Sequence, residues 1–183
     1  ASPYDLSGGP KQRVSMAGVV IDNVEILMCD EPLANLDPAT GKQAIGLIDD
    51  IMQQTSTTVV IIEHRLEDVL YRYVDRIVLM HEGRILADMP PDELLSGELL
   101  RENGIREPLY VTALKYAGVA MKPEMKPGRV DTLALGEDDK QAVRTWLQTT
   151  NPPALPPCEE ELLKIENLGF AYEKGKPVLH DIS

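Results

Sequence analysis

The stretch LSGGPKQR, at residues 6–13, is the part of the sequence that says most about the fold. Its Gly8 and Gly9 leave backbone N–H groups open to close approach by a ligand. The helix predicted from Pro10 to Val20 would present a positive N-terminus to an anion, and Pro is tolerated in its first turn. Ser7 adds a hydroxyl donor. Taken alone, the same residues also fit an ordinary helix N-cap.

Two apolar runs follow, and each ends in polar residues. The first, ILMC at 26–29, predicts a strand buried on both faces that delivers Asp30 and Glu31. One carboxylate there can hold Mg²⁺, and its neighbour can take a proton from an attacking water. The second run, Thr58–Ile62, predicts another buried strand, with His64 just beyond it to donate a hydrogen bond to a phosphoryl oxygen. Singly, these residues also fit an acidic turn and a surface histidine.

The region from residue 10 to residue 95 alternates helical stretches with short β-branched runs, which is typical of parallel α/β units. From 97 to 157 the regularity fades, and the run NPPALPP at 151–157 predicts a linker with restricted, extended backbone. We predict helices at 39–54, 66–73, 91–96 and 138–149, a hairpin of 76–80 with 84–89, and strands at 162–172 and from 178 onward.

Charge and composition exclude several classes of protein. The formal net charge of −12 argues against a polyanionic partner. Residues 97–157 contain eight Lys plus Arg and eight Asp plus Glu, so this segment has no excess of positive charge with which to bind RNA. The two cysteines are isolated, which leaves no zinc-ligand spacing. No apolar run of about 18 residues occurs, so we expect no membrane span.

The four motifs, taken in order and spacing, resemble those of an ABC transporter ATPase domain. LSGGPKQR is similar to the family's signature motif, with Pro10 where Gln is usual. ILMCDE at 26–31 resembles Walker B with the catalytic glutamate, ANLD at 34–37 the D-loop, and Glu63-His64 the switch-histidine loop. The Walker A pattern G-x-x-x-x-G-K-[ST] is absent; TGK at 40–42 is the nearest fragment. We therefore expect the N-terminal half of this domain upstream, and the fragment alone to be inactive.

The resemblance implies a role for each matched residue. Ser7, Gly8 and Gly9 would contact the γ-phosphate of an ATP held chiefly by an opposite ATPase domain. His64 would contact the γ-phosphate. Asp37 would lie along the interface between the paired domains.

Two further roles concern the implied cofactors, ATP and Mg²⁺. By the resemblance, Asp30 would orient Mg²⁺ through water and Glu31 would polarise the attacking water. Phosphoryl transfer needs positioning and charge neutralisation more than covalent chemistry, and these residue types suit it.

The last part of the sequence resembles the opening strands of a second ABC domain. Tyr172 falls where the family's adenine-stacking aromatic sits; a generic hairpin with an exposed Tyr is the alternative. The predicted organisation is α/β throughout: residues 1–96 as the C-terminal part of a P-loop NTPase (ABC) domain, 97–157 as an inter-domain joint, and 158–183 as the start of the second domain.

The stretches 104–111 and 114–119 resemble the joint of tandem ATPases from energy-coupling-factor importers; a structured spacer that packs on the first domain is the alternative. The implied function is an ATP-binding and hydrolysing importer subunit for a metal ion or vitamin. Its expected partners are a second ABC domain, in the same chain, and transporter membrane subunits, with no nucleic acid, at the cytoplasmic face of the plasma membrane. The alternative is a soluble tandem ABC ATPase acting on ribosomes, which the balanced charge of the joint disfavours.

Overall fold

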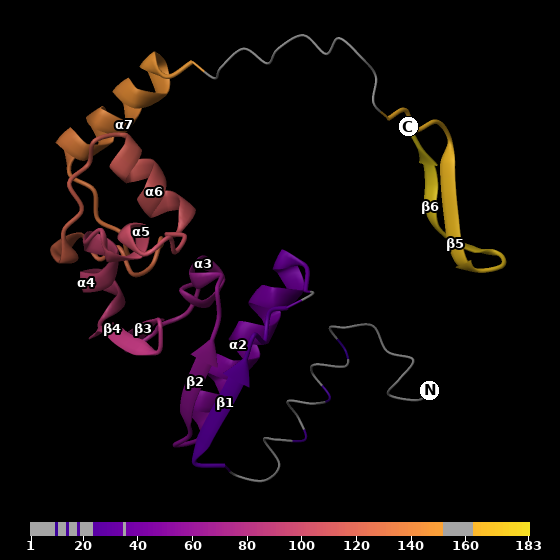
Figure 1. The fold of residues 1–183 in the computed structure, drawn as a ribbon, viewed down its shortest axis with the longest axis horizontal. Helices are drawn as coiled ribbons and strands as arrows, with labels where there is room; N and C mark the ends of the chain where they lie inside the picture. Colours follow the sequence, from indigo (N-terminus) through magenta and orange to yellow (C-terminus); the bar gives the residue numbers. More distant parts are fainter. Residues whose placement is uncertain (1–9, 11–13, 15–17, 19–23, 35, 152–162) are drawn as a thin grey trace. The chain divides into compact units, whose positions relative to one another are not determined.

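The computed structural model describes residues 10, 14, 18, 24–34, 36–151 and 163–183. The chain divides into two units, Ala1–Thr149 and Thr150–Ser183, each described here by itself (Figure 1). Of the helix predicted from Pro10 to Val20, the described residues Pro10, Val14 and Gly18 are helical. The structure is a mixed α/β fold, as the sequence predicts.

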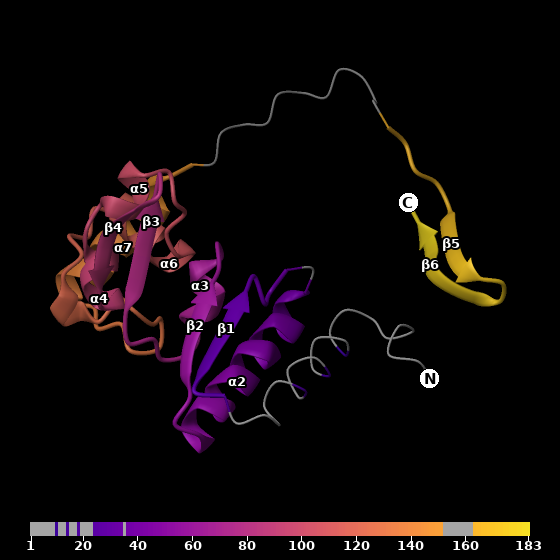
Figure 2. The same ribbon diagram turned by 60° about the horizontal axis from the view of Figure 1, so that its bottom comes forward.

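The predicted pair of apolar strands forms a β–α–β unit. Strand β1 (Ile26–Asp30) pairs in parallel with β2 (Thr58–Ile62), in a register that sets Asp30 opposite Ile62. Helix α2 (Pro38–Gln54) connects them and lies along the small sheet (Figure 2). It begins one residue before the predicted start, because Asp37 caps its N-terminus and Pro38 suits its first turn.

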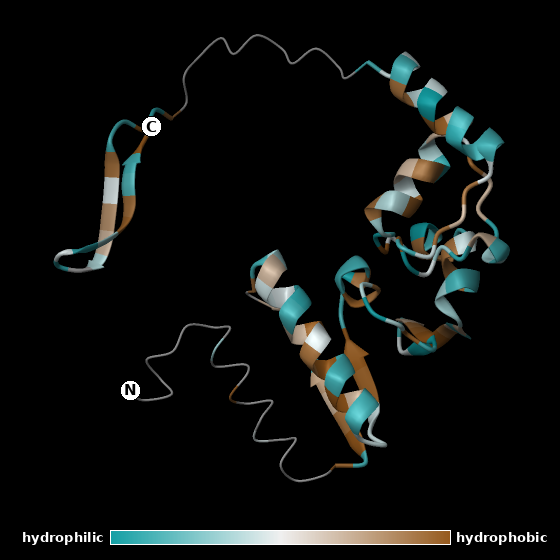
Figure 3. Cartoon of the chain, turned by 180° about the vertical axis from the view of Figure 1, so that it is seen from behind, coloured by the Kyte–Doolittle hydropathy of each residue, from teal (hydrophilic) through white to brown (hydrophobic). Residues whose placement is uncertain are grey.

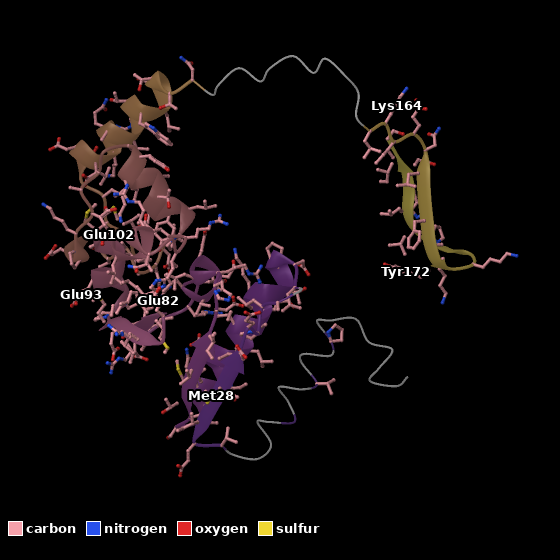
Figure 4. All side chains as sticks on the ribbon, in the orientation of Figure 1. Met28, Glu82, Glu93, Glu102, Lys164 and Tyr172 are labelled. Atoms are coloured by element: carbon pink, nitrogen blue, oxygen red, sulfur yellow. The ribbon has the colours of Figure 1, made fainter. Side chains whose placement is uncertain are left out.

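The β1–β2 sheet is covered on one face only, among the described residues. Its Leu27 and Cys29 side packs toward the α2 core; on the other side Ile26 is 61% exposed and Met28 69% exposed (Figure 4). Both strands are strongly hydrophobic, whereas α2 mixes hydrophilic and hydrophobic residues (Figure 3). The prediction of strands buried on both faces is therefore wrong for the described structure, since strand side chains alternate and one helix covers one face.

Beyond β2 comes a short helix, α3 (Leu66–Val69), and then the predicted hairpin. Helix α3 ends four residues before the predicted limit. Strands β3 (Ile77–His81) and β4 (Arg84–Met89) pair antiparallel. Glu82 and Gly83 connect them with φ of 47° and 72°. Two successive positive φ values define a type I′ turn, whose twist matches that of a hairpin.

The segment after the hairpin carries more regular structure than its sequence predicts. Besides the expected α4 (Pro91–Ser96) and α7 (Glu137–Thr149), it forms α5 (Leu99–Glu102), α6 (Leu109–Tyr116) and a 3₁₀ turn, η2 (Pro123–Met125). Its Leu94, Leu95, Leu100 and Val111 share one core with Leu79 and Ala87 of the hairpin and with Leu70, which follows α3. Tertiary packing on β3 and β4 thus stabilises helices too short to form alone.

A charged pair closes this same segment. Lys115 Nζ lies 2.5 Å from Glu107 Oε1 and 2.5 Å from the Gly97 carbonyl oxygen. The Glu107 side chain is only 6% exposed, so the ammonium group compensates a carboxylate removed from water. The contact ties α6 back to the end of α4.

The second unit holds one antiparallel hairpin, β5 (Leu168–Glu173) with β6 (Lys176–Ile182). Gly175, with φ of 85°, makes its turn. The described residues 163–167 precede β5 and lie outside any strand. The observed strand is therefore shorter than the predicted one, 162–172. Across the described parts of both units, no helix is both long and apolar enough to cross a bilayer.

Candidate functional site

The candidate site lies at the carboxyl edge of the β1–β2 sheet. Because the two strands run parallel, the residues that follow each of them meet at the same edge. The Glu31 N–H donates to the Ile62 carbonyl oxygen at 2.9 Å, which extends the strand pairing one residue beyond Asp30. This local backbone contact brings the end of one predicted motif beside the start of the other.

Glu31 and His64, 33 positions apart in sequence, are in direct contact. His64 Nε2 lies 3.0 Å from Glu31 Oε1. When Nε2 carries its proton, it donates to the carboxylate. The His64 side chain is 84% exposed and the Glu31 side chain 50% exposed, so both are accessible to a ligand at this edge. The structure therefore brings together an acid-base group and a hydrogen-bond donor that the sequence places on separate motifs.

The backbone around this pair is held by two side chains to which the sequence analysis gave no role. Glu63 Oε1 accepts a hydrogen bond from the Leu33 N–H at 3.0 Å, and Arg65 Nη2 donates to the Leu33 carbonyl at 2.5 Å. Arg65 Nε also lies 3.3 Å from Asp68 Oδ2. The sequence feature that could have indicated this role is the pair of charged residues, Glu63 and Arg65, on either side of His64.

Asp30 stands exposed at the end of β1. Among the residues that the structure describes, no group of three or more His, Cys, Asp or Glu side chains is placed to hold a metal ion. Mg²⁺ keeps several waters and commonly takes one or two carboxylates plus substrate phosphates. A single accessible carboxylate beside Glu31 fits that mode of binding, and it does not fit an all-protein metal cage.

Asp37 has a clear local role as the N-cap of α2. Its carboxylate accepts hydrogen bonds from the N–H groups of Ala39 and Thr40 and from the Thr40 hydroxyl. The Thr40 hydroxyl and then the Thr40 N–H stabilise the charged form and lower the pKa of Asp37 below its ordinary 3.8. Its predicted place along a domain interface stays a prediction.

The remaining predicted residues are outside the described part of the first unit or belong to the second unit. Ser7, Gly8 and Gly9 lie outside the described residues. Tyr172 (Figure 4) belongs to the second unit and is 84% exposed. Its ring meets the Phe170 ring edge-on, with 4.8 Å between the ring centroids. An exposed ring on a hairpin can stack with a planar base, but it can equally be an ordinary surface Tyr.

Comparisons with known proteins agree with the motifs. A sequence family described as "ATP-binding cassette cobalt transporter" matches residues 97–170. An ABC transporter ATP-binding protein of Vibrio parahaemolyticus is 53% identical over 184 residues, covering 100% of this chain and 31% of that protein. One from Clostridium perfringens is 51% identical over 182 residues, covering 100% and 32%. One from Streptococcus pneumoniae is 49% identical over 180 residues, covering 98% and 31%. The chain spans about a third of the length of these curated relatives.

Proposed function

This chain belongs to the family of ABC transporter ATP-binding proteins, and we propose that it forms part of the ATP-hydrolysing subunit of an importer. The observation that carries the proposal is the 3.0 Å contact between Glu31 Oε1 and His64 Nε2. It joins the two residues that hydrolysis needs most, at the edge where parallel sheets place their ligand chemistry.

The proposed reaction is attack of water on the γ-phosphoryl group of ATP. Bound ATP with Mg²⁺ supplies that group and neutralises its charge. Asp30, at the end of β1, would hold the cation. Glu31 polarises the attacking water and accepts its proton. His64 donates a hydrogen bond to the γ-phosphate, for which its 84% exposed side chain is accessible.

The other predicted residues would serve the pairing of ATPase domains and the nucleotide of a second domain. Ser7, Gly8 and Gly9 close over the γ-phosphate of an ATP held by an opposite ATPase domain, where a helix N-terminus favours an anion. Asp37 lies along the interface of the paired domains. Tyr172 stacks on the adenine of a second domain that begins near residue 158. The 183-residue chain lacks the Walker A pattern, and by itself it does not turn over ATP.

The transporter class rests on the segment after the hairpin. Residues 97–170 match a family described as a cobalt transporter, and the segment carries eight basic and eight acidic residues up to residue 157. The match and the balanced charge support transport over a ribosome-bound role, which would need a basic surface for RNA. The parent is then a tandem ATPase of an energy-coupling-factor importer for a metal ion or vitamin. It is peripheral, at the cytoplasmic face of the plasma membrane, and docks on membrane subunits.

The test uses the full-length protein that contains this chain. Glu31→Gln keeps the size of the side chain and one acceptor oxygen but removes its basicity. We expect steady-state phosphate release to fall by at least a hundredfold, since general-base catalysis contributes about 10²–10⁴-fold, while ATP still binds in equilibrium titration. Glu93→Gln, at an exposed position of α4 (Figure 4), is the matched control and should leave both unchanged. Normal turnover in Glu31→Gln would disprove the assignment of the base.

A further inference from the structure

The main chain of Leu33 is held at both of its polar groups by the loop that follows β2. Its N–H donates to Glu63 Oε1 at 3.0 Å, and its carbonyl accepts from Arg65 Nη2 at 2.5 Å. Leu33 itself is fully buried, at 0% exposure. Two charged side chains, 30 and 32 positions away in sequence, therefore fix one peptide segment in the interior of the fold.

These contacts bracket the proposed reacting pair. Leu33 lies two residues after Glu31, and Glu63 and Arg65 lie on either side of His64. We propose that Glu63 is a positioning residue for ATP hydrolysis: with Arg65, it ties the loop of the catalytic base to the loop of the γ-phosphate donor and so sets the distance between Glu31 and His64. This inference rests on the proposed function.

The Glu31–His64 contact does not hold the two loops together by itself. The side chains are 50% and 84% exposed, and exposed ion pairs contribute about 0–1 kcal/mol. Glu31 also has a φ of 44°, a left-handed backbone that a non-glycine residue keeps only where its surroundings impose it. Hydrogen bonds from N–H groups to a carboxylate are short and roughly twice as strong as neutral ones. Together with the Arg65 bond, the Glu63 bridge is therefore better able to hold the two loops together than the exposed Glu31–His64 pair.

A local role for Glu63 is the competing explanation. Its second oxygen, Oε2, accepts from the His64 N–H at 3.0 Å and from the Arg65 N–H at 3.3 Å. Glu63 could serve only to cap its own loop, with the Leu33 bond incidental. The bridge to Leu33 uses Oε1 and needs the full side-chain length, whereas the local cap uses Oε2 and nearby N–H groups. Substitutions that change the length or the acceptor atoms therefore separate the two roles.

Two conservative variants make that separation. Glu63→Asp is one methylene shorter, so it still caps the N–H groups of its own loop and loses the bridge to Leu33. Glu63→Gln keeps the length, and its carbonyl oxygen still reaches the Leu33 N–H, whereas its amide group cannot accept from the loop. The positioning role predicts that Gln retains more activity than Asp. A purely local capping role predicts the reverse order.

The experiment measures ATP turnover and amide hydrogen exchange on the full-length protein. We expect Glu63→Asp to lower kcat by roughly ten- to a hundredfold, since misplacement of reacting groups by about 1 Å has effects of that size. KM for ATP should stay within about twofold, because the bridge orients the reacting pair and does not touch nucleotide. The amide of Leu33 should exchange faster than in the wild type. Glu93→Asp is the matched control in both measurements.

The outcomes separate the two proposals. A wild-type kcat in Glu63→Asp, or greater activity in Asp than in Gln, overturns the positioning role. Unchanged exchange at Leu33 in Glu63→Asp overturns the bridge itself, whatever the kinetics show. Normal turnover in Glu31→Gln instead removes the proposed function, and the positioning role with it, while the exchange measurement still reports whether the bridge exists.

Discussion

Replacing Leu33 by Ala tests whether the loop after Glu31 is anchored in the core. The Leu33 side chain is 0% exposed and packs with Ala44, Ile45 and Ile48 of α2 and with Val69 beyond β2. The substitution removes most of this apolar contact and leaves the main-chain N–H and C=O in place. It therefore probes the hydrophobic anchor separately from the two hydrogen bonds that the main chain makes.

The expected loss follows from complete burial. Leu→Ala substitutions in cores cost about 2–5 kcal/mol, through lost transfer free energy and the cavity left behind. We expect about 3 kcal/mol here, because Leu33 packs with α2 and with the four-residue helix α3, and such a site can partly collapse. For a cooperative unit of roughly 150 residues, that loss lowers Tm by about 6–12 °C.

Scanning calorimetry of the full-length protein measures the shift. Leu109→Ala is the matched control, since the chemical change is the same and Leu109 is 55% exposed at the start of α6. Its Tm should stay within about 2 °C of the wild type, because surface substitutions are usually within about 0.5 kcal/mol. Equal shifts in the two variants would show that Leu33 is not an anchor and would refute the reasoning.

Three further changes test other parts of the first unit. His64→Ala in the full-length protein should lower phosphate release by about a hundredfold, as the loss of one transition-state donor does; an unaffected rate would make it a surface histidine. Lys115→Met leaves the Glu107 carboxylate buried and unpaired and should destabilise the unit by about 3–5 kcal/mol in urea unfolding, with recovery expected when Glu107→Gln is added. Because hydrogen bonds from Thr40 lower the pKa of Asp37 in the folded state, that carboxylate contributes stability that is present above its ordinary 3.8 and lost as the pH falls through the lowered value. Asp37→Asn keeps an N-cap without a titrating group, so the wild type's advantage in Tm should shrink as the pH is lowered from 6 toward 2, and a constant difference would contradict the assignment.

The parts of the site that lie close to a strand end could be predicted from the sequence. Asp30 and Glu31 directly follow one apolar run and His64 closely follows another, and parallel strands place their carboxyl ends at one edge. The predicted family is confirmed by relatives that match the whole chain. What the pattern could not show is the contact itself, because the separation of Glu31 from His64 depends on how the two loops are held after the strands end.

The helices of the segment from 97 to 136 were missed for a different reason. Helix α5 has four residues and α6 eight, each below the length at which local propensity stabilises a helix. Leu100, 1% exposed, and Val111, 0% exposed, gain their stability from the hairpin core with Leu79 and Ala87. Those partners lie at least 13 residues earlier in the chain, so no local window contains the interaction that decides the structure.

The backbone of Glu31 departs from the conformation that its residue type prefers. Its φ of 44° belongs to a region that costs a non-glycine residue about 1–2 kcal/mol. Glycine would avoid that cost, but it carries no carboxylate and could not act as the proposed base. The main chain on both sides is held, because the Glu31 N–H donates to the Ile62 carbonyl and the Glu31 carbonyl accepts from the Ala34 N–H at 3.0 Å. A residue whose conformational preference disagrees with its backbone, yet whose main-chain N–H and carbonyl are both hydrogen-bonded, is what a site shaped by chemistry requires.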